Sequence, residues 1–380
     1  TSQRYVTFKS NFQRHLSRIP KIGTEINRFF TYINTKIRKV VYKSTFFEDL
    51  GFRYYGPIDG HDIDLLVDVF NAAKAHNHSV LIHVNTIKGK GYYPAEKNPT
   101  QFHGIGKFDI NTGEPKSSGK NFSAAFGEVM CKFAQKDSRI CCVTAAMAEG
   151  TGLCNFAKQY PKRFFDVGIA EQHAVTFSSG LAKNGLIPVF AVYSTFLQRG
   201  FDQILHDVAI GNYPVIFGLD RSGLVGADGE THQGIFDIPY LSIIPNVTVM
   251  APINGKELSE MLKHTLHHAK GPTAIKYSRG EASSLYEDQF EELHYGKGQI
   301  LKEGKEAVII AVGNIFEEAD KAEKILKEEG YEIGLVNPRY IKPFDQELIM
   351  RLSQTYDKIM IVTAYRSMTS STGQWSADLE

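Results

Sequence analysis

The sequence predicts an α/β protein in which parallel β-sheets are covered by helices. Short apolar runs, typical of buried strands, alternate along the chain with amphipathic stretches of helical length. Polar or glycine-rich segments follow several of these runs, at the positions where parallel sheets carry ligand-binding loops. The 380 residues, 42% hydrophobic and 22% charged, are enough for two or three domains and exclude a disordered or coiled-coil protein.

Two further protein classes are excluded by composition. No run of about 18 apolar residues occurs, so the sequence predicts no membrane span. Four cysteines in 380 residues, two of them adjacent (Cys141 and Cys142), form no disulfide framework and favour a reducing compartment.

The first 45 residues are strongly basic. They carry ten Lys or Arg and one acid, Glu25, for a net charge of +9, whereas the remainder carries −8. Apolar residues recur there every three or four positions, which predicts two amphipathic helices separated near Pro20 and Gly23. Helices docked on a neighbour, with solvated charges outside, are the favoured interpretation. A nucleic-acid-binding arm is a weaker alternative, because no recognisable motif accompanies the charge. An organelle-targeting segment shares the Arg-rich, acid-poor character but is disfavoured because the sequence starts at Thr1 and not at Met.

Three blocks of strands and helices are expected after this stretch. The first has a strand at 53–55, a helix at 63–74 and a strand at 80–85, followed by a long loop and linker at 91–119. The second has strands at 140–144, 164–167, 188–192, 215–219, 247–250 and 274–277, with helices at 123–134, 171–184, 200–210 and 255–268. After a polar linker at 281–298, the third has strands at 307–312, 333–336 and 359–362, with helices at 316–328 and 346–354.

Candidate site residues follow these strands. The motif DVGIAEQH places Glu171 in the first turn of a helix, where the helix dipole favours a carboxylate. Glu171 is therefore either a helix-start acid or a carboxylate held in an apolar cleft against a ligand nitrogen. The next motif, YSTFLQRGFD, offers Tyr193, Phe196 and Arg199, although a structural pair between Arg199 and Asp202 explains the spacing equally well.

The most informative motif is DRSGLVGADGETHQG, a glycine-rich loop after a strand. It carries Arg221, Asp228 and His232, and its glycines allow the backbone to approach a ligand closely. Arg279 in YSRG adds a second guanidinium, which suits either bidentate phosphate binding or a surface ion pair. The segments KGKGYYPAE, with Tyr92, and FHGIGKFD do not have P-loop spacing.

Together with GPIDGHD and TAAMAEGTGL, these motifs resemble the 1-deoxy-D-xylulose-5-phosphate synthase family of transketolase-like, thiamine-diphosphate-dependent enzymes. The resemblance covers about residues 45–365. It implies a transketolase-like fold with a C-terminal domain of the transketolase-C type. It also implies a tail of the first domain at 1–119, a pyrimidine-binding domain at 120–298 and an incomplete C-terminal domain at 299–380. The activity implied is decarboxylation of pyruvate and transfer of its two-carbon unit to D-glyceraldehyde 3-phosphate, for isoprenoid, thiamine and pyridoxal synthesis.

The resemblance also assigns roles to residues. Glu171 matches the glutamate at the cofactor's aminopyrimidine ring, Phe196 the aromatic residue stacked on that ring, and Tyr92 a tyrosine against the cofactor. His103 and His232 match active-site histidines that handle protons. The remaining matches form the pocket for the aldehyde phosphate: Tyr193, Arg199, Arg221, Asp228 and Arg279.

One family element has no counterpart in the sequence. The GDG motif and downstream Asn that bind magnesium and the cofactor diphosphate are absent, and residues 364–380 lose the resemblance. We therefore expect part of a longer protein, whose metal ligands precede Thr1 and which binds thiamine diphosphate weakly when alone. The family further implies a homodimer in bacterial cytoplasm or a plastid, with no nucleic-acid or membrane partner. A split beta-type subunit of a related enzyme and a non-catalytic dimerising paralogue are the alternatives.

Overall fold

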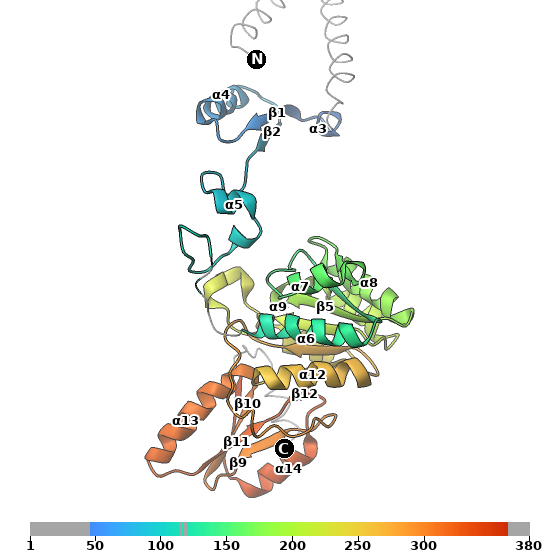
Figure 1. Ribbon diagram of the computed structural model, residues 1–380, viewed down its shortest axis with the longest axis vertical. Coiled ribbons are helices and arrows are strands. Elements are labelled where there is room, and N and C mark those ends of the chain that lie inside the picture. Colours follow the sequence, from blue (N-terminus) through green and yellow to red (C-terminus); the bar gives the residue numbers. More distant parts are fainter. Residues whose placement is uncertain (1–45, 115, 117–120, 364–380) are drawn as a thin grey trace, which may run out of the picture. The chain divides into compact units, whose positions relative to one another are not determined.

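The computed structural model describes residues 46–114, 116 and 121–363, and it contains two compact units, 1–115 and 116–380 (Figure 1). The helices expected within residues 1–45 and the divergent tail at 364–380 lie outside the described residues. No helix in the part of the chain that is described is long and apolar enough to cross a membrane.

The first unit contains a two-stranded parallel sheet with its connecting helix. Strand β1 (Arg53–Asp59) pairs with β2 (Val80–Asn85), and α4 (Ile63–Lys74) joins them. Helix α4 begins after Asp62, whose carboxylate accepts a hydrogen bond from the Leu65 amide over 3.0 Å. Strand β1 runs past the predicted end at residue 55. The expected loop at 91–119 was only partly right, because it contains the short helix α5 (Tyr93–Lys97) and a 3-10 turn at Gln101–His103; α3 (Phe46–Asp49) precedes β1.

The second unit is built on a seven-stranded sheet in the order β12-β7-β8-β6-β5-β3-β4. All of its pairs are parallel except that of β12 with β7. Strand β12 was not predicted, because three residues between Arg339 and Pro343 give too short a pattern. The strands are β3 (Ile140–Thr144), β4 (Phe164–Asp166), β5 (Ile187–Tyr193), β6 (Ile216–Asp220), β7 (Thr248–Met250), β8 (Thr273–Lys276) and β12 (Tyr340–Lys342).

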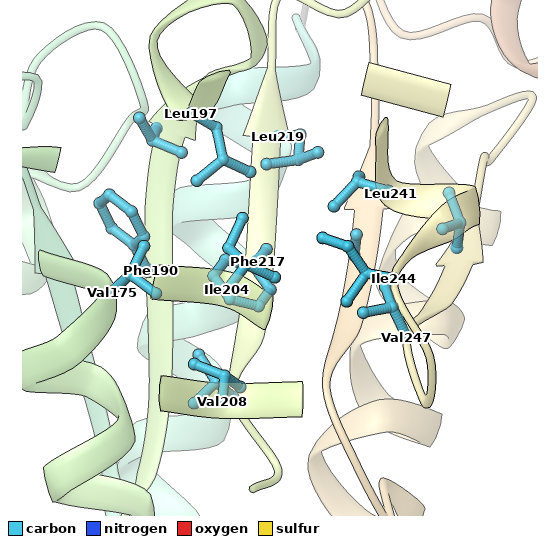
Figure 2. Packing of buried hydrophobic residues seen from close by; sticks show 14 of the residues in the cluster. Val175, Phe190, Leu197, Ile204, Val208, Phe217, Leu219, Leu241, Ile244 and Val247 are labelled. Atoms are coloured by element: carbon cyan, nitrogen blue, oxygen red, sulfur yellow. The ribbon is translucent and has the colours of Figure 1, made fainter. Parts of the chain in front are cut away.

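Helices cover both faces of this sheet, since its strands are buried on both sides. Alternate residues of one strand therefore enter different cores: Phe190 lies in one and Val189 in the other. Figure 2 shows Phe190 and Phe217 in the first core, beside Ile204. Elements contributing to this core are α8 (Glu171–Lys183), α9 (Ser194–Leu197), the π-helix Ile204–Ala209 after α10 (Phe201–Gln203), and α11 (Asp237–Ile243). The opposite core includes α6 (Phe122–Lys136), α7 (Cys154–Gln159) and α12 (Gly255–His268).

A four-stranded sheet in the order β13-β10-β11-β9 forms the rest of this unit. Strand β10 again serves two cores, with Val308 and Ile310 on one face and Ile309 and Ala311 on the other. The first face packs against α14 (Gln346–Thr355) and the second against α13 (Phe316–Glu328). The strands are β9 (Gln299–Lys302), which is antiparallel to β11 and was not predicted, β10 (Ala307–Val312), β11 (Ile333–Asn337) and β13 (Ile359–Thr363).

Candidate active site

The carboxyl ends of β5, β6 and β8 bring three of the predicted segments together. Tyr193 at the end of β5 pairs with Asp220 on β6, and Leu219 pairs with Lys276 on β8. Loops that follow neighbouring parallel strands emerge at one edge of the sheet, which is where ligands bind in such folds. The motifs beginning at Tyr193, Asp220 and Tyr277 therefore share an edge.

Two arginines and one carboxylate form an ion-pair cluster at this edge. Arg221 donates a short hydrogen bond from Nη1 to Oδ2 of Asp228, and Arg279 Nη2 lies 3.3 Å from Oδ1 of the same carboxylate. Asp228 is largely buried, with a side-chain exposure of 14%, while Arg279 retains 36%. Two guanidinium groups against one carboxylate leave a net charge of +1, which suits an incoming phosphate.

The Tyr193 ring packs against the ion-pair cluster. The guanidinium carbon of Arg221 lies 3.9 Å from the centre of the Tyr193 ring, a cation–π contact. Burial raises the pKa of Tyr193 to about 12, so its hydroxyl stays protonated at neutral pH. A Cβ at Gly150 would lie 1.6 Å from the Tyr193 hydroxyl oxygen, so the ring position depends on glycine there.

Aromatic side chains extend from this ion-pair cluster towards His232. Phe196 is stacked with Tyr193 at a centroid distance of 5.9 Å and meets His232 edge-on at 5.3 Å. The Nδ1 atom of His232 lies 3.0 Å from the Thr231 hydroxyl oxygen. His232 is thus held beside two aromatic rings at the edge of the cluster.

Glu171 is the first residue of α8 and is buried, with 2% of its surface exposed. Its Oε1 accepts a hydrogen bond from Arg199 Nη1 at 2.5 Å, and the Arg199 guanidinium also lies 5.0 Å from the Phe196 ring centre. Arg199 therefore contacts Glu171, rather than Asp202 as the alternative interpretation supposed. Its carboxylate partner also differs from that of Arg221 and Arg279, which both bind Asp228.

The glycine-rich loop is closed at its base. The amides of Gly223 and Gly234 each donate to the other's carbonyl, over 2.8 and 2.9 Å. Arg221 adopts a φ of 58°, in the left-handed region that costs a non-glycine residue about 1 kcal/mol or more. The Ser222 amide donates to the Tyr277 carbonyl over 3.0 Å, which ties this strained turn to the segment that carries Arg279.

The other two predicted site residues belong to the first unit. The Tyr92 hydroxyl donates to the Ile110 carbonyl over 2.9 Å, and its ring packs against Phe102 and Phe108. The Nδ1 atom of exposed His103 lies 2.8 Å from Lys88 Nζ. Their roles stay a prediction.

Three family models match successive parts of the chain. These are 1-deoxy-D-xylulose-5-phosphate synthase over residues 1–86, the transketolase pyrimidine-binding domain over 118–283 and the transketolase C-terminal domain over 296–372. The 1-deoxy-D-xylulose-5-phosphate synthase of Halothermothrix orenii is 46% identical over 93% of this chain, and that of Clostridium kluyveri is 47% identical over 95%. The chain belongs to the 1-deoxy-D-xylulose-5-phosphate synthase family.

Solved structures support the transketolase-like fold of this family member. A split-gene transketolase, described as an inactive beta4 tetramer, is 25% identical with a TM-score of 0.62, over 69% of this chain and 86% of its own. A transketolase from Pichia stipitis matches with a TM-score of 0.56 at 17% identity, over 72% of this chain and 42% of its own. By contrast, the chain spans 56% and 57% of the length of the two synthases named above.

The donor set fits part of the cofactor that the synthase family implies. Buried Glu171 and the Phe196 ring, which both contact Arg199, suit an aminopyrimidine, which needs a hydrogen-bonding carboxylate and an aromatic face. Residues 46–114 and 121–363 contain no group of three or more His, Cys, Asp or Glu side chains placed to hold a metal ion. The residues described here therefore suit the ring end of thiamine diphosphate rather than its metal-bound end.

The motif-based predictions missed several polar residues beneath the site. Asp237 and Lys276 form a fully buried ion pair at 2.5 Å, and burial lowers the pKa of Lys276 to about 8. Ser194 and Ser222 also donate to Asp237. The available signal was a charge inside an apolar run, as in GIFDIP and TAIKYS.

Proposed function

We propose that this chain provides the pyrimidine-side and aldehyde-phosphate-side residues of a 1-deoxy-D-xylulose-5-phosphate synthase. The reaction converts pyruvate and D-glyceraldehyde 3-phosphate into 1-deoxy-D-xylulose 5-phosphate and carbon dioxide. The observation that carries the proposal is the Arg221–Asp228–Arg279 cluster, placed over Tyr193 and joined through Phe196 to buried Glu171. This arrangement puts a phosphate-binding group beside a group suited to the cofactor ring.

Each residue then has a defined task. Arg221 and Arg279 bind the phosphate of the aldehyde, and Asp228 holds both guanidinium groups in place before the substrate arrives. Tyr193 and His232 contact the substrate from the aromatic side, where His232 handles a proton. For Tyr92 and His103 we propose the roles that the family resemblance gives them, a contact with the cofactor and proton handling respectively.

Glu171 and Phe196 bind the aminopyrimidine. Thiamine diphosphate, when bound, supplies the carbon nucleophile and the electron sink that pyruvate decarboxylation needs. Glu171 shares a proton with a ring nitrogen, and its burial strengthens that hydrogen bond. Arg199 contacts the same carboxylate, so we assign it to the Glu171 side of the phosphate pocket.

We also propose the wider organisation that the family implies. The domain boundaries 1–119, 120–298 and 299–380 are supported by the unit boundary after Pro115 and by the ranges of the three family models. Magnesium is proposed as the partner of the cofactor diphosphate, held by residues outside those that we describe. A homodimer in bacterial cytoplasm or a plastid is the assembly and compartment that the family resemblance implies.

Product analysis tests the proposed reaction. The chain is incubated with pyruvate, glyceraldehyde 3-phosphate, thiamine diphosphate and Mg²⁺, with and without the N-terminal segment of a related synthase. We expect equal amounts of 1-deoxy-D-xylulose 5-phosphate and carbon dioxide by mass spectrometry when both parts are present. Product from xylulose 5-phosphate and ribose 5-phosphate instead would contradict the proposal.

Replacing Glu171 by Ala is the sharpest single test of the cofactor-side assignment. Loss of a proton-sharing group is expected to reduce turnover by about 10²–10⁴-fold, measured in the same product assay. Glu257→Gln is the control, because Glu257 is an equally buried glutamate whose partner, Arg339, lies outside the site. Substantial activity in Glu171→Ala would refute the assignment.

The split-gene transketolase provides a second candidate. Its structure matches 69% of this chain with a TM-score of 0.62 at 25% identity, which supports a transketolase-like subunit of this type. In that case activity would require a different polypeptide that carries the metal-binding region. Co-purification of such a polypeptide with the tagged chain, together with transketolase activity, would favour this candidate over the synthase.

A further inference from the structure

A buried polar cluster lies beneath the proposed aldehyde-phosphate site. Its centre is Asp237, the first residue of α11, and its donors come from the ends of three strands. Oδ2 of Asp237 accepts hydrogen bonds from the Ser194 hydroxyl at 2.7 Å and the Ser222 hydroxyl at 2.8 Å, and Oδ1 accepts from Lys276 Nζ at 2.5 Å. All four residues are buried, with 1% of each exposed.

Stability alone does not account for this cluster. Removing two charges from water costs several kcal/mol per ion, and an apolar pair of the same volume is often equally stable or more so. The core on this face of the sheet, which includes Leu219 and Ile238, is apolar and would accommodate that replacement. The contribution of the ion pair is geometric, because each hydrogen bond to Asp237 fixes the position of its donor side chain.

Each donor lies close in sequence to a proposed binding residue. Ser194 follows Tyr193, Ser222 follows Arg221, and Lys276 precedes Arg279 by three positions. The Ser222 amide also donates to the Tyr277 carbonyl, directly after the residue Arg221 with its left-handed conformation. A Cβ at Gly234 would lie 2.8 Å from the Ser194 hydroxyl oxygen, so the end of the glycine-rich loop packs directly on the cluster.

We propose that Asp237 is a positioning residue that fixes the three strand-end loops relative to one another. One carboxylate, by binding Ser194, Ser222 and Lys276, sets the spacing of Tyr193, Arg221 and Arg279. The identity of the ligand rests on the proposed function. The rigidity of the loops does not depend on the proposed function, so the positioning role and the function can be tested separately.

Amide hydrogen exchange in Asp237→Asn tests the positioning role on the chain itself. The amide cannot satisfy the Lys276 ammonium as a carboxylate does, so exchange of the amides within 222–234 should accelerate about tenfold or more, as expected for loss of a charged hydrogen bond. Glu257→Gln is the matched control, because it also removes a charge from a buried ion pair and should leave exchange in 222–234 unchanged. Equal exchange of this segment in the wild type and Asp237→Asn would overturn the proposal.

Kinetics separate this proposal from the proposed function. In an active wild-type assembly, Asp237→Asn should raise KM for glyceraldehyde 3-phosphate about tenfold while KM for pyruvate changes less than about twofold. Equal increases in both constants would overturn the positioning role. Wild-type protein that is inactive with these substrates, but shows the expected exchange difference, refutes the function and supports the positioning role.

Single-donor variants cover the case in which Asp237→Asn does not fold. Ser222→Ala removes one hydrogen bond and should accelerate exchange within 222–234, whereas Ser194→Ala should do so within 193–197. Wild-type exchange in both variants would overturn the proposal.

Discussion

At the scale of single residues, the proposed phosphate site is built from two arginines that bind the same carboxylate. Asp228 binds two arginines, so neither guanidinium is positioned independently of the other. Arg221 additionally rests on the Tyr193 ring. Arg279 is the more exposed arginine and has fewer contacts of its own, which makes it the better probe of phosphate binding.

Replacing Arg279 by Ala should raise KM for glyceraldehyde 3-phosphate by about 10–100-fold, since a charged hydrogen bond contributes about 1.5–3 kcal/mol. KM for pyruvate, which lacks a phosphate, should stay unchanged. Arg279→Lys should show an intermediate KM, because it keeps the charge but loses bidentate geometry. Steady-state kinetics with each substrate varied in turn measures both constants, and a parallel rise in both would contradict the assignment.

Asp220 makes stability depend on pH. Its burial at the end of β6 raises the pKa of the carboxyl from 3.8 to about 7. Between these values the folded state binds more protons than the unfolded state, so stability falls as pH rises from about 4 to about 7. Asp220→Asn removes this titration and should gain stability relative to the wild type over the same range, by on the order of 4 kcal/mol at about 1.36 kcal/mol per pH unit. Urea unfolding of both proteins at pH 4.5 and pH 8 measures the difference, and parallel pH profiles would refute it.

At the scale of elements, the segments that follow parallel strands carry most of the proposed site residues, and glycines allow these segments to pack closely. The turn at 148–153 passes against Tyr193 at Gly150, where a side chain has no room. Helix α8 contains Gly180, where an added Cβ meets no atom within 4 Å. The two glycines therefore have opposite tolerance to substitution.

Gly150→Ala should displace the Tyr193 ring and its contact with Arg221, and so raise KM for the phosphate substrate by about tenfold or more. Gly180→Ala is the control and should raise the unfolding free energy by about 0.5–1 kcal/mol, since alanine is the better helix former. Kinetics and denaturant unfolding of both variants provide the measurements. Normal kinetics in Gly150→Ala would show that the Tyr193 position does not matter.

At the scale of the whole second unit, a buried ion pair connects its two sheets. Glu257 lies on α12, which packs on the seven-stranded sheet, and accepts a hydrogen bond from Arg339 Nε at 2.9 Å. Arg339 lies in the turn between β11 of the four-stranded sheet and β12 of the seven-stranded sheet. Arg339 also donates to the side chain of Gln299 on β9. The two sheets are therefore connected by the short turn between β11 and β12 and by this buried ion pair.

Arg339→Met should destabilise the protein by about 3–5 kcal/mol, because it leaves the Glu257 carboxylate buried and unpaired. A double variant, Glu257→Met with Arg339→Met, should recover part of this loss, since it removes both charges. Guanidinium unfolding curves of the three proteins measure the differences. A double variant less stable than Arg339→Met would contradict this explanation.

The sequence by itself determined the α/β alternation, the bounds of helices such as α4 and α12, and the motifs that identify the family, because these depend on local periodicity and on residue order. Only the tertiary structure decided which charges meet. Arg199 binds Glu171, Asp228 binds two arginines, and Asp237 binds Lys276 and two serines. These partners lie between 7 and 51 positions apart or on different strands, and their distances depend on strand order and packing, which no local pattern encodes. Strands β9 and β12 were not predicted for a similar reason. Each is too short to show a pattern of its own, and each pairs with a strand distant in sequence.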